Sequence, residues 1–360
     1  MTIFRTQESA SNDNDIKSVE VRAEMEPFTV EDQQQDGNGN IVVSPTWKHW
    51  FRRLVQWRHR DPSTSQFIRQ LIGHAQLGGF TIFKFSQLAA STNNFSYQNK
   101  IGEGSFGPVY KGVLANGVHV AIKKRRVFPE SIQSDVQFEN ELQIIPKLQH
   151  ANVIKLLGCC TEGNERILVY EYMPKRLKAG VFLSWPLRCR IIEGIAQGAA
   201  YLHHHSRLGS LVHGDLKPGN ILLDCDMNPR ISDFGLVEVL ESEEDEKEID
   251  AISGTPGYID PLLVEIQRIS TKSDVYGFGA TSLVIMTAHD PLMEFDTGRS
   301  LVGHSNGADR RRAMELIDAS LRNDPQINEI LRCMHIALLC VQPDWADRPT
   351  MSEMPEYHLA

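Results

Sequence analysis

The feature that most constrains the fold is a glycine-rich run at residues 101–111 (IGEGSFGPVYK) and the pattern that follows it. Val109 and Tyr110, and then residues 118–122, are apolar runs on either side of a turn at residues 115–117. Two such runs joined by a short loop that contains glycine predict a β-hairpin. A dinucleotide-binding fold instead needs its glycines to precede a helix, with an acidic residue about 20 positions further on. The hairpin therefore excludes that fold.

The same glycines predict a phosphate-binding loop. Without side chains at Gly102, Gly104 and Gly107, backbone N–H groups can close over phosphate oxygens. The second strand of the hairpin ends at Lys123, which we expect to point towards those phosphates. The alternative is a solvated lysine in the basic run at residues 123–126.

A helix with one buried face is predicted over residues 136–148. Its apolar residues are spaced three or four apart: Phe138, Leu142, Ile145 and Leu148. Glu141 lies beside this stripe and is the expected partner of Lys123, with Glu139, on a different face, as the alternative. Pro146 is expected to end or kink the helix.

Residues 212–220 (VHGDLKPGN) place a carboxylate, an ammonium and an amide at short fixed spacing. Asp215 could accept a proton from a hydroxyl, Lys217 could neutralise a moving phosphoryl group, and Asn220 could hold a metal ion. A surface turn is the alternative, because these residue types are common in loops.

A second metal-binding residue is predicted shortly after that run. Asp233 in the DFG sequence at 233–235 follows Asn220 by about a dozen residues. Its carboxylate could chelate Mg²⁺ on ATP phosphates, because this hard ion prefers one or two carboxylates together with phosphate. The order of the two motifs favours this function over a loop.

Together the motifs resemble a eukaryotic protein kinase domain, and specifically the plant receptor-like kinases related to interleukin-receptor-associated kinases. The resemblance runs from about Phe85 to the C-terminus and rests on LAASTNNF, IGEGSFGPVYKG, KLQH, LLGCC, LVYEYM, HGDLKPGNILLD, GTPGYIDP and KSDVYGFG. It implies an α+β, two-lobed protein kinase fold, with a small β-rich N-lobe at 81–173 and a larger, mainly helical C-lobe at 174–360. The last helix would be truncated, because residues 352–357 stop inside it.

The resemblance also implies roles for single residues. The catalytic residues would be Asp215, Lys217, Lys123 and Glu141. The metal ligands would be Asn220 and Asp233, and the cofactors ATP and Mg²⁺, with Mn²⁺ as an alternative. Tyr170 would gate the rear of the nucleotide pocket, residues 171–173 would form the adenine-binding hinge, and Lys217 with Thr255 would match the serine/threonine-specific pattern. The nucleotide contacts would be Ile101, Gly102, Glu103, Gly104, Ser105, Phe106, Gly107, Val109, Ala121, Lys123, Tyr170, Glu171 and Met173.

The chain departs from this family at Gly214. Arginine is usual there, and its guanidinium clasps a phosphate on the activation segment through charge-assisted hydrogen bonds. The segment at 241–250 instead carries seven carboxylates and one lysine. We therefore expect that phosphorylation of this segment does not switch the domain through an arginine clasp. A solvated acidic loop without a regulatory role is the alternative.

A second departure is Leu262. The family usually has glutamate there, paired with an arginine that corresponds to Arg348. Loss of this carboxylate would leave Arg348 as an unpaired buried charge, at a cost of about 3–5 kcal/mol, unless Asp260 or Glu265 replaces it. Leu262→Glu would then raise the melting temperature.

The remaining departures are regional. Residues 174–180 are shorter and more basic than their family counterpart, and residues 296–312 match the family poorly.

Composition bounds the partners. A length of 360 residues fits one two-lobed domain and an extension, and the net charge of −9 argues against a nucleic-acid partner. The six cysteines show no disulfide or metal spacing, which predicts reduced thiols and a cytoplasmic location. No run reaches transmembrane length, and the apolar stretch at 278–288 is predicted to be a buried helix.

The extension at 1–80 divides into two parts. Residues 6–40 are rich in Asp, Glu, Gln, Asn and Ser and are predicted to be disordered. Residues 46–60 combine aromatic residues at helical spacing, such as Trp47 and Trp50, with Lys48, Arg52 and Arg53. This pattern is typical of a helix on an anionic membrane, here the inner face of the plasma membrane. The alternative is a helix that packs its tryptophans onto the kinase domain.

Two functions follow. The first is a serine/threonine kinase that transfers the ATP γ-phosphate to protein hydroxyls in signalling, with a receptor kinase as a further partner. The second is a signalling pseudokinase that binds partners or nucleotide without turnover. The complete set of Lys123, Asp215, Asn220 and Asp233 favours the enzyme. The features that favour the pseudokinase are Gly214, Pro146, Leu262 and the truncated last helix.

Overall fold

The computed structural model describes residues 34–35, 41–42, 79–104, 106–125, 132–177, 183–206, 208–289, 291–292 and 314–354. The predictions for the segment at 46–60, for Ser105 and for residues 296–312 and 355–360 fall outside these ranges. The chain divides into two units, 1–51 and 52–360. In the first unit, β1 (Gln34–Gln35) pairs with β2 (Ile41–Val42).

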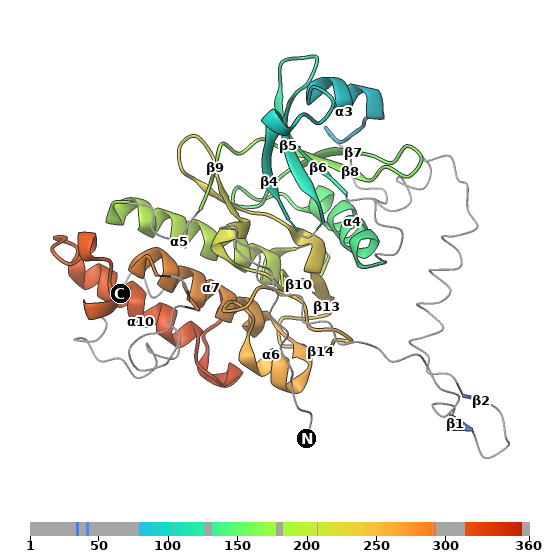
Figure 1. The fold of residues 1–360 in the computed structure, drawn as a ribbon. Helices are drawn as coiled ribbons and strands as arrows, with labels where there is room; N and C mark the ends of the chain where they lie inside the picture. The colour runs from blue at the N-terminus through green and yellow to red at the C-terminus, as the bar shows by residue number, and fades with distance from the viewer. Residues whose placement is uncertain are drawn as a thin grey trace, which may run out of the picture. The chain divides into compact units, whose positions relative to one another are not determined.

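The N-lobe of the second unit is built on a six-stranded sheet in the order β3-β7-β8-β6-β5-β4 (Figure 1). The strands are β3 (Thr81–Ile82), β4 (Lys100–Glu103), β5 (Pro108–Val113), β6 (His119–Lys124), β7 (Leu156–Cys160) and β8 (Ile167–Glu171). β5 and β6 form the predicted hairpin, with Val113 opposite His119 and Gly117 in the turn at φ +81°. Glycine suits this left-handed conformation because it has no Cβ.

One face of this sheet packs under α4 (Ile132–Ile144). Phe138 and Leu142 of α4 are buried in the same cluster as Leu168 and Tyr170 of β8. The helix ends at Ile144, and a 3-10 turn over Ile145–Lys147 follows, with Pro146 inside it. The prediction that the proline ends the helix is thus confirmed. On the far side of the hairpin, α3 (Phe85–Ser91) packs against β5.

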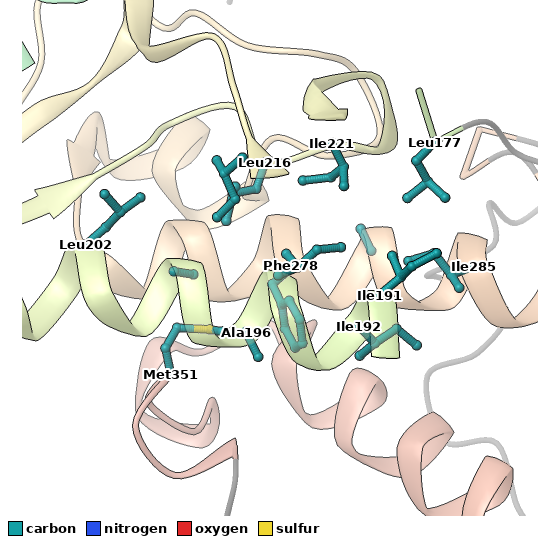
Figure 2. Close-up of a cluster of buried hydrophobic side chains, with 14 of the residues drawn as sticks. Leu177, Ile191, Ile192, Ala196, Leu202, Leu216, Ile221, Phe278, Ile285 and Met351 are labelled. Atoms are coloured by element: carbon teal, nitrogen blue, oxygen red, sulfur yellow. The ribbon is translucent and has the colours of Figure 1, made fainter. Parts of the chain in front are cut away.

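The C-lobe is mainly helical and centres on α7 (Thr271–Thr287), which is buried along almost its whole length. The buried helix predicted at 278–288 is therefore present. α5 (Trp185–Ala200) and α10 (Ile327–Cys340) pack against α7, and α6 (Pro261–Ile266) precedes it. Figure 2 shows part of the apolar core between α5 and α7. Its residues include Ile191, Ile192 and Ala196 of α5, Phe278 and Ile285 of α7, and Leu216 and Ile221 from the chain between these helices.

Several short paired strands lie between residues 175 and 269. β10 (Ser210–Val212) pairs with β13 (Glu238–Leu240), and β11 (Ile221–Leu223) lies between β9 (Lys175–Arg176) and β12 (Pro229–Ile231). β14 (Lys247–Glu248) pairs with β15 (Arg268–Ile269). Residues 213–220 thus connect β10 to β11, and Asp233 follows β12 closely. A β-sheet N-lobe and a helical C-lobe confirm the predicted two-lobed α+β fold.

The expectation that Arg348 is left unpaired is wrong. Arg348 is 2% exposed, and its two terminal nitrogens lie 2.7 and 2.8 Å from the carboxylate oxygens of Asp260. The indole N–H of Trp345 donates to the same carboxylate at 2.6 Å. Of the two residues considered as replacements, Asp260 pairs with Arg348, whereas Glu265 is exposed. The carboxylate has moved two positions along the chain from Leu262.

Candidate active site

A buried ammonium joins the two lobes. Lys123 on β6 lies 2.7 Å from a carboxylate oxygen of Glu141 on α4 and 2.6 Å from one of Asp233. Glu141, and not Glu139, is thus the residue that pairs with Lys123. The phenol of Tyr170 on β8 donates a hydrogen bond to the other oxygen of Glu141. The group joins the N-lobe sheet, α4 and the segment after β12.

The pKa values of this group follow from its burial and its charges. Burial alone would lower the pKa of Lys123, but the carboxylates of Asp233 and Glu141 outweigh it and raise that pKa above its usual range. Burial likewise opposes ionisation of Asp233, yet the Lys123 ammonium holds the pKa of that carboxyl below its usual value. For Glu141 burial dominates and raises the pKa. Lys123 and Asp233 are therefore charged at neutral pH.

The predicted catalytic loop, residues 213–220, carries the Asp215 carboxylate, which has three neighbours. Asp215 Oδ2 lies 2.7 Å from the Lys217 ammonium and accepts a hydrogen bond from the Asn220 amide at 3.0 Å. Asp215 Oδ1 accepts one from the Thr255 hydroxyl at 2.8 Å. The Lys217 ammonium also donates to the Thr255 hydroxyl. Charged side chains from positions 215 and 217 thus meet a hydroxyl from the activation segment.

Asp274 near the start of α7 orients the beginning of this loop. Its Oδ2 accepts the backbone N–H of His213 at 2.7 Å, and its Oδ1 accepts that of Gly214 at 2.9 Å. A ring nitrogen of His203 lies 3.0 Å from Oδ2. Burial opposes ionisation, but the bond to His203 and its neighbours hold the pKa of Asp274 below its usual value. Neither Asp274 nor His203 was predicted to have a role, although an aspartate near the start of an apolar helix is a usable signal.

Gly214 itself has a left-handed backbone, with φ +79°. A Cβ at this position would lie 3.0 Å from the carbonyl oxygen of Leu236. Glycine avoids both the torsional cost and this close approach. The residue that departs from the family is therefore well suited to the backbone it occupies.

Most of the predicted nucleotide contacts lie on strands of the N-lobe sheet. Ile101, Gly102 and Glu103 lie on β4, Val109 on β5, Ala121 on β6, and Tyr170 and Glu171 on β8, next to Met173. A Cβ added at Gly102 or Gly104 would have no neighbour within 4 Å, so the glycines leave open space beside the loop.

Phe106 lies in the glycine-rich loop, directly before Gly107. It is buried, its ring is 6.2 Å from that of Phe138 on α4, and the Lys123 nitrogen lies 5.1 Å from its centroid. The loop thus contacts α4 and Lys123 directly through Phe106.

The residues fit a divalent cation bound together with phosphate. The side chain of Asp233 is 36% exposed, so its carboxylate is accessible. Asn220 uses its amide nitrogen to bind Asp215, which leaves the amide oxygen, the atom that hard cations prefer, on the other side. The described part of the chain has no cluster of three or more His, Cys, Asp or Glu arranged as metal ligands. An ion such as Mg²⁺ is held by one or two protein oxygens together with phosphates.

Comparisons with known proteins agree with the fold and the site. The protein kinase domain family matches residues 95–359, and the chain belongs to this family. It is 45% identical over 286 residues to cysteine-rich receptor-like protein kinase 5 of Arabidopsis thaliana, and the aligned region covers 75% of the chain and 42% of that relative. It is 41% identical over 308 residues to a G-type lectin S-receptor-like serine/threonine-protein kinase of the same plant, which covers 82% of the chain and 36% of the relative. The resemblance to plant receptor-like serine/threonine kinases is thus confirmed.

The chain spans about two fifths of the length of the curated relatives it matches. Among the residues that the structure describes, no helix has both the length and the apolarity needed to cross a bilayer.

Proposed function

We propose that the chain transfers the γ-phosphate of ATP to serine or threonine hydroxyls of a protein substrate. The observation that carries this proposal is the joint placement of Asp215, Lys217 and Thr255 on one side of the site and of Lys123 with Asp233 on the other. These groups are what phosphoryl transfer to a hydroxyl needs: a base, cations and a metal ligand. The membership of the protein kinase family supports the same reaction.

Each residue has a defined task. Asp215 accepts the proton of the incoming hydroxyl, and the amide of Asn220 holds its carboxylate in position. Lys217 places positive charge where the phosphoryl group moves, and Lys123 binds the nucleotide phosphates. Asp233 and Asn220 would hold Mg²⁺, which neutralises phosphate charge when bound with ATP. Lys217 and Thr255 contact each other beside Asp215, so both border the place where the acceptor hydroxyl enters.

The test is autophosphorylation of the purified chain with ATP and Mg²⁺, compared with an Asp215→Asn variant. We expect phosphoserine and phosphothreonine in the wild type and a loss of about 10²–10⁴-fold in the variant, the usual contribution of a general base. Equal signal in both would contradict the proposal. Repeating the assay with Mn²⁺ identifies the metal.

A pseudokinase is the second candidate, and no contact in the site favours it. It predicts no signal above the Asp215→Asn control, together with nucleotide-dependent thermal stabilisation. The pairing of the buried Arg348 with Asp260 removes one reason for this alternative.

We also propose that phosphorylation of the activation segment, residues 241–250, does not switch this domain between an active and an inactive state. Described carboxylates of the segment already have partners: Glu246 pairs with the Arg268 guanidinium at 2.9 Å, and Glu243 lies 2.8 Å from a ring nitrogen of His204. Gly214 offers no guanidinium for a phosphate, and added phosphate would face like charges. Phosphatase treatment of the native chain should therefore leave kcat nearly unchanged. A strong loss of activity would refute this expectation.

The extension is expected to contribute localisation, through a peripheral membrane contact at 46–60 or through a receptor kinase partner. Sedimentation of the full chain and of a chain without residues 1–60 with anionic liposomes tests the membrane contact. Equal sedimentation would count against it.

A further inference from the structure

Arg176 belongs to the segment that follows the predicted hinge, but its side chain contacts the predicted catalytic loop at residues 213–220. In β9 it is opposite Leu222 of β11, the strand that leaves the catalytic loop. Its Nε donates to the carbonyl oxygen of Gly219 at 2.5 Å. A Cβ on Gly219 would be 3.1 Å from the Arg176 terminal nitrogen and 3.5 Å from the side chain of Lys217. The guanidinium is thus a neighbour of the residues that surround the acceptor site.

The charge of Arg176 is available to a ligand. Arg176 and Lys175 are both exposed. Within the described residues, these two cations hydrogen-bond to uncharged groups: Arg176 to the Gly219 carbonyl and Lys175 to the Met227 sulfur at 3.3 Å. The nearby carboxylate of Glu171 instead contacts Arg230, at 3.3 Å. The bond to Gly219 uses one of the five guanidinium N–H groups, and the others can bind a carboxylate in a bidentate manner.

The position of the acceptor links this charge to the substrate. A hydroxyl that is phosphorylated here must reach Asp215 beside Lys217. An extended peptide advances about 3.3 Å per residue, with side chains on alternate faces. Gly219 lies two positions from Lys217 along the loop, so a side chain only a few residues from the acceptor can reach Arg176. Such a contact would select among substrates and leave the chemical step unchanged.

We propose that Arg176, assisted by Lys175, is a specificity-determining residue that recognises an aspartate or glutamate a few residues from the phosphorylated serine or threonine. This inference rests on the proposed function, because it assigns a substrate class, acidic peptides, to the same site. Arg176 is not a catalytic residue, since it acts on the flanking sequence and not on the reacting atoms.

The experiment measures kcat/KM for serine peptides in which each position on both sides of the acceptor is Asp, Glu, Ala or Lys in turn. The wild type should prefer acid over alanine by about fivefold at one or two positions, the strength of an exposed ion pair at its upper limit. Arg176→Ala should abolish the preference, and Arg176→Glu should reverse it in favour of lysine. Arg176→Lys keeps the charge without the Nε bond and should retain the preference.

The matched control is Arg190→Ala. Arg190 is also exposed and also donates to a backbone carbonyl, that of Asp226 at 2.9 Å, but it lies on α5. This variant should keep the acid preference. The melting temperature of every variant is measured, and KM for ATP should be the same in all of them.

Three results would overturn the inference. They are an acid preference that survives in Arg176→Ala, no acid preference in the wild type, and an Arg176→Ala effect confined to KM for ATP. A loss of turnover on neutral peptides in both Arg176→Ala and Arg176→Lys would also count against it, because it would mean that the arginine only holds Gly219 in place.

A binding experiment distinguishes failure of the proposed function from failure of the inference about Arg176. Binding of acidic and neutral peptides with alanine at the acceptor position is measured by fluorescence anisotropy on the wild type and on Arg176→Ala. This readout needs no turnover. An inactive chain that still binds the acidic peptide tighter through Arg176 would sink the kinase proposal alone. An active chain that binds and phosphorylates both peptides equally would sink only the inference about Arg176.

Discussion

Two buried cations, Lys123 between the lobes and Arg348 in the C-lobe, meet carboxylates in different ways. Lys123 faces two carboxylates, Glu141 and Asp233, and the side chain of Asp233 is 36% exposed. Arg348 faces one carboxylate, Asp260, and neither side chain of that pair is exposed. The Arg348 guanidinium also donates to the backbone carbonyls of Gln342, Lys272 and Pro343.

The difference separates a reactive site from a structural one. The Lys123 group holds two carboxyl groups against one ammonium, and the side chain of one of them, Asp233, is 36% exposed, which favours the binding of a further cation there. The Arg348 pair is electrically balanced, and its donors are saturated, which is the condition under which a buried ion pair is tolerated. The four predictions below test this contrast, from the largest expected effect to the smallest.

Asp260→Ala should have the largest effect, on stability. The change leaves the Arg348 guanidinium and the Trp345 N–H without their shared acceptor, at a cost of about 3–5 kcal/mol in the free energy of unfolding. Urea denaturation measures it. Glu265→Ala, on the same helix but exposed, is the control and should change little. A loss below 1 kcal/mol for Asp260→Ala would mean that the pair is not structural.

Lys123→Met should act mainly on activity. Removal of a cation that stabilises transferring phosphate typically lowers kcat by about 10²–10³-fold. The matched control is Lys124→Met, the next residue of β6, which pairs at the surface with Glu165 at 3.1 Å. Steady-state phosphorylation assays compare the two variants. Equal activities would remove the functional half of the contrast.

Asp274→Asn should cost about 1–3 kcal/mol at neutral pH, because the N–H groups of His213 and Gly214 donate to different carboxylate oxygens, and in asparagine one of these oxygens becomes an NH2 donor. The pKa of Asp274 is lowered in the folded state, so its contribution is present above the unfolded pKa of about 3.9 and is lost as the pH falls through the folded pKa. The difference between wild type and variant should therefore shrink below pH 4.

Unfolding curves at pH 7, 5, 4 and 3 measure this dependence. Asp344→Asn, which changes an exposed aspartate that accepts from the Ala346 N–H, is the control. A difference between wild type and Asp274→Asn that stays constant down to pH 3 would contradict the assignment.

Leu262→Glu should have the smallest effect, within about 0.5 kcal/mol, because Arg348 already has a carboxylate. In the Asp260→Ala background the same substitution should recover part of the lost stability. Differential scanning calorimetry of both pairs is the measurement. A rise of several degrees in the otherwise native chain would show that Arg348 still lacks a charge partner.

Local patterns predicted much of this molecule. The hairpin of β5 and β6, the end of α4 at Pro146 and the burial of α7 follow from short-range spacing and from proline and glycine. The contact of Lys123 with Glu141 was also expected, because the stripe on α4 selected one of two glutamates. These features depend on residues close in sequence or on a recognisable motif.

Contacts over long separations were harder to predict. Asp260 and Arg348 are 88 residues apart, and the two candidate carboxylates, Asp260 and Glu265, could not be ranked without coordinates. The bonds from Asp274 to two backbone N–H groups were missed because backbone donors leave no trace in the side-chain pattern. The position of Arg176 on Gly219 depends on the pairing of β9 with β11, two strands of two and three residues.

The pairing of Arg348 with Asp260 also has a historical consequence. If an ancestor carried glutamate at 262 like most of its family, two substitutions separate it from the present chain. An intermediate with neither carboxylate would have lost about 3–5 kcal/mol, much of the 5–15 kcal/mol by which domains are usually stable. Such a path keeps its full stability only if the aspartate is in place before the glutamate is lost. With Asp260 present, Arg348 no longer requires a carboxylate at position 262.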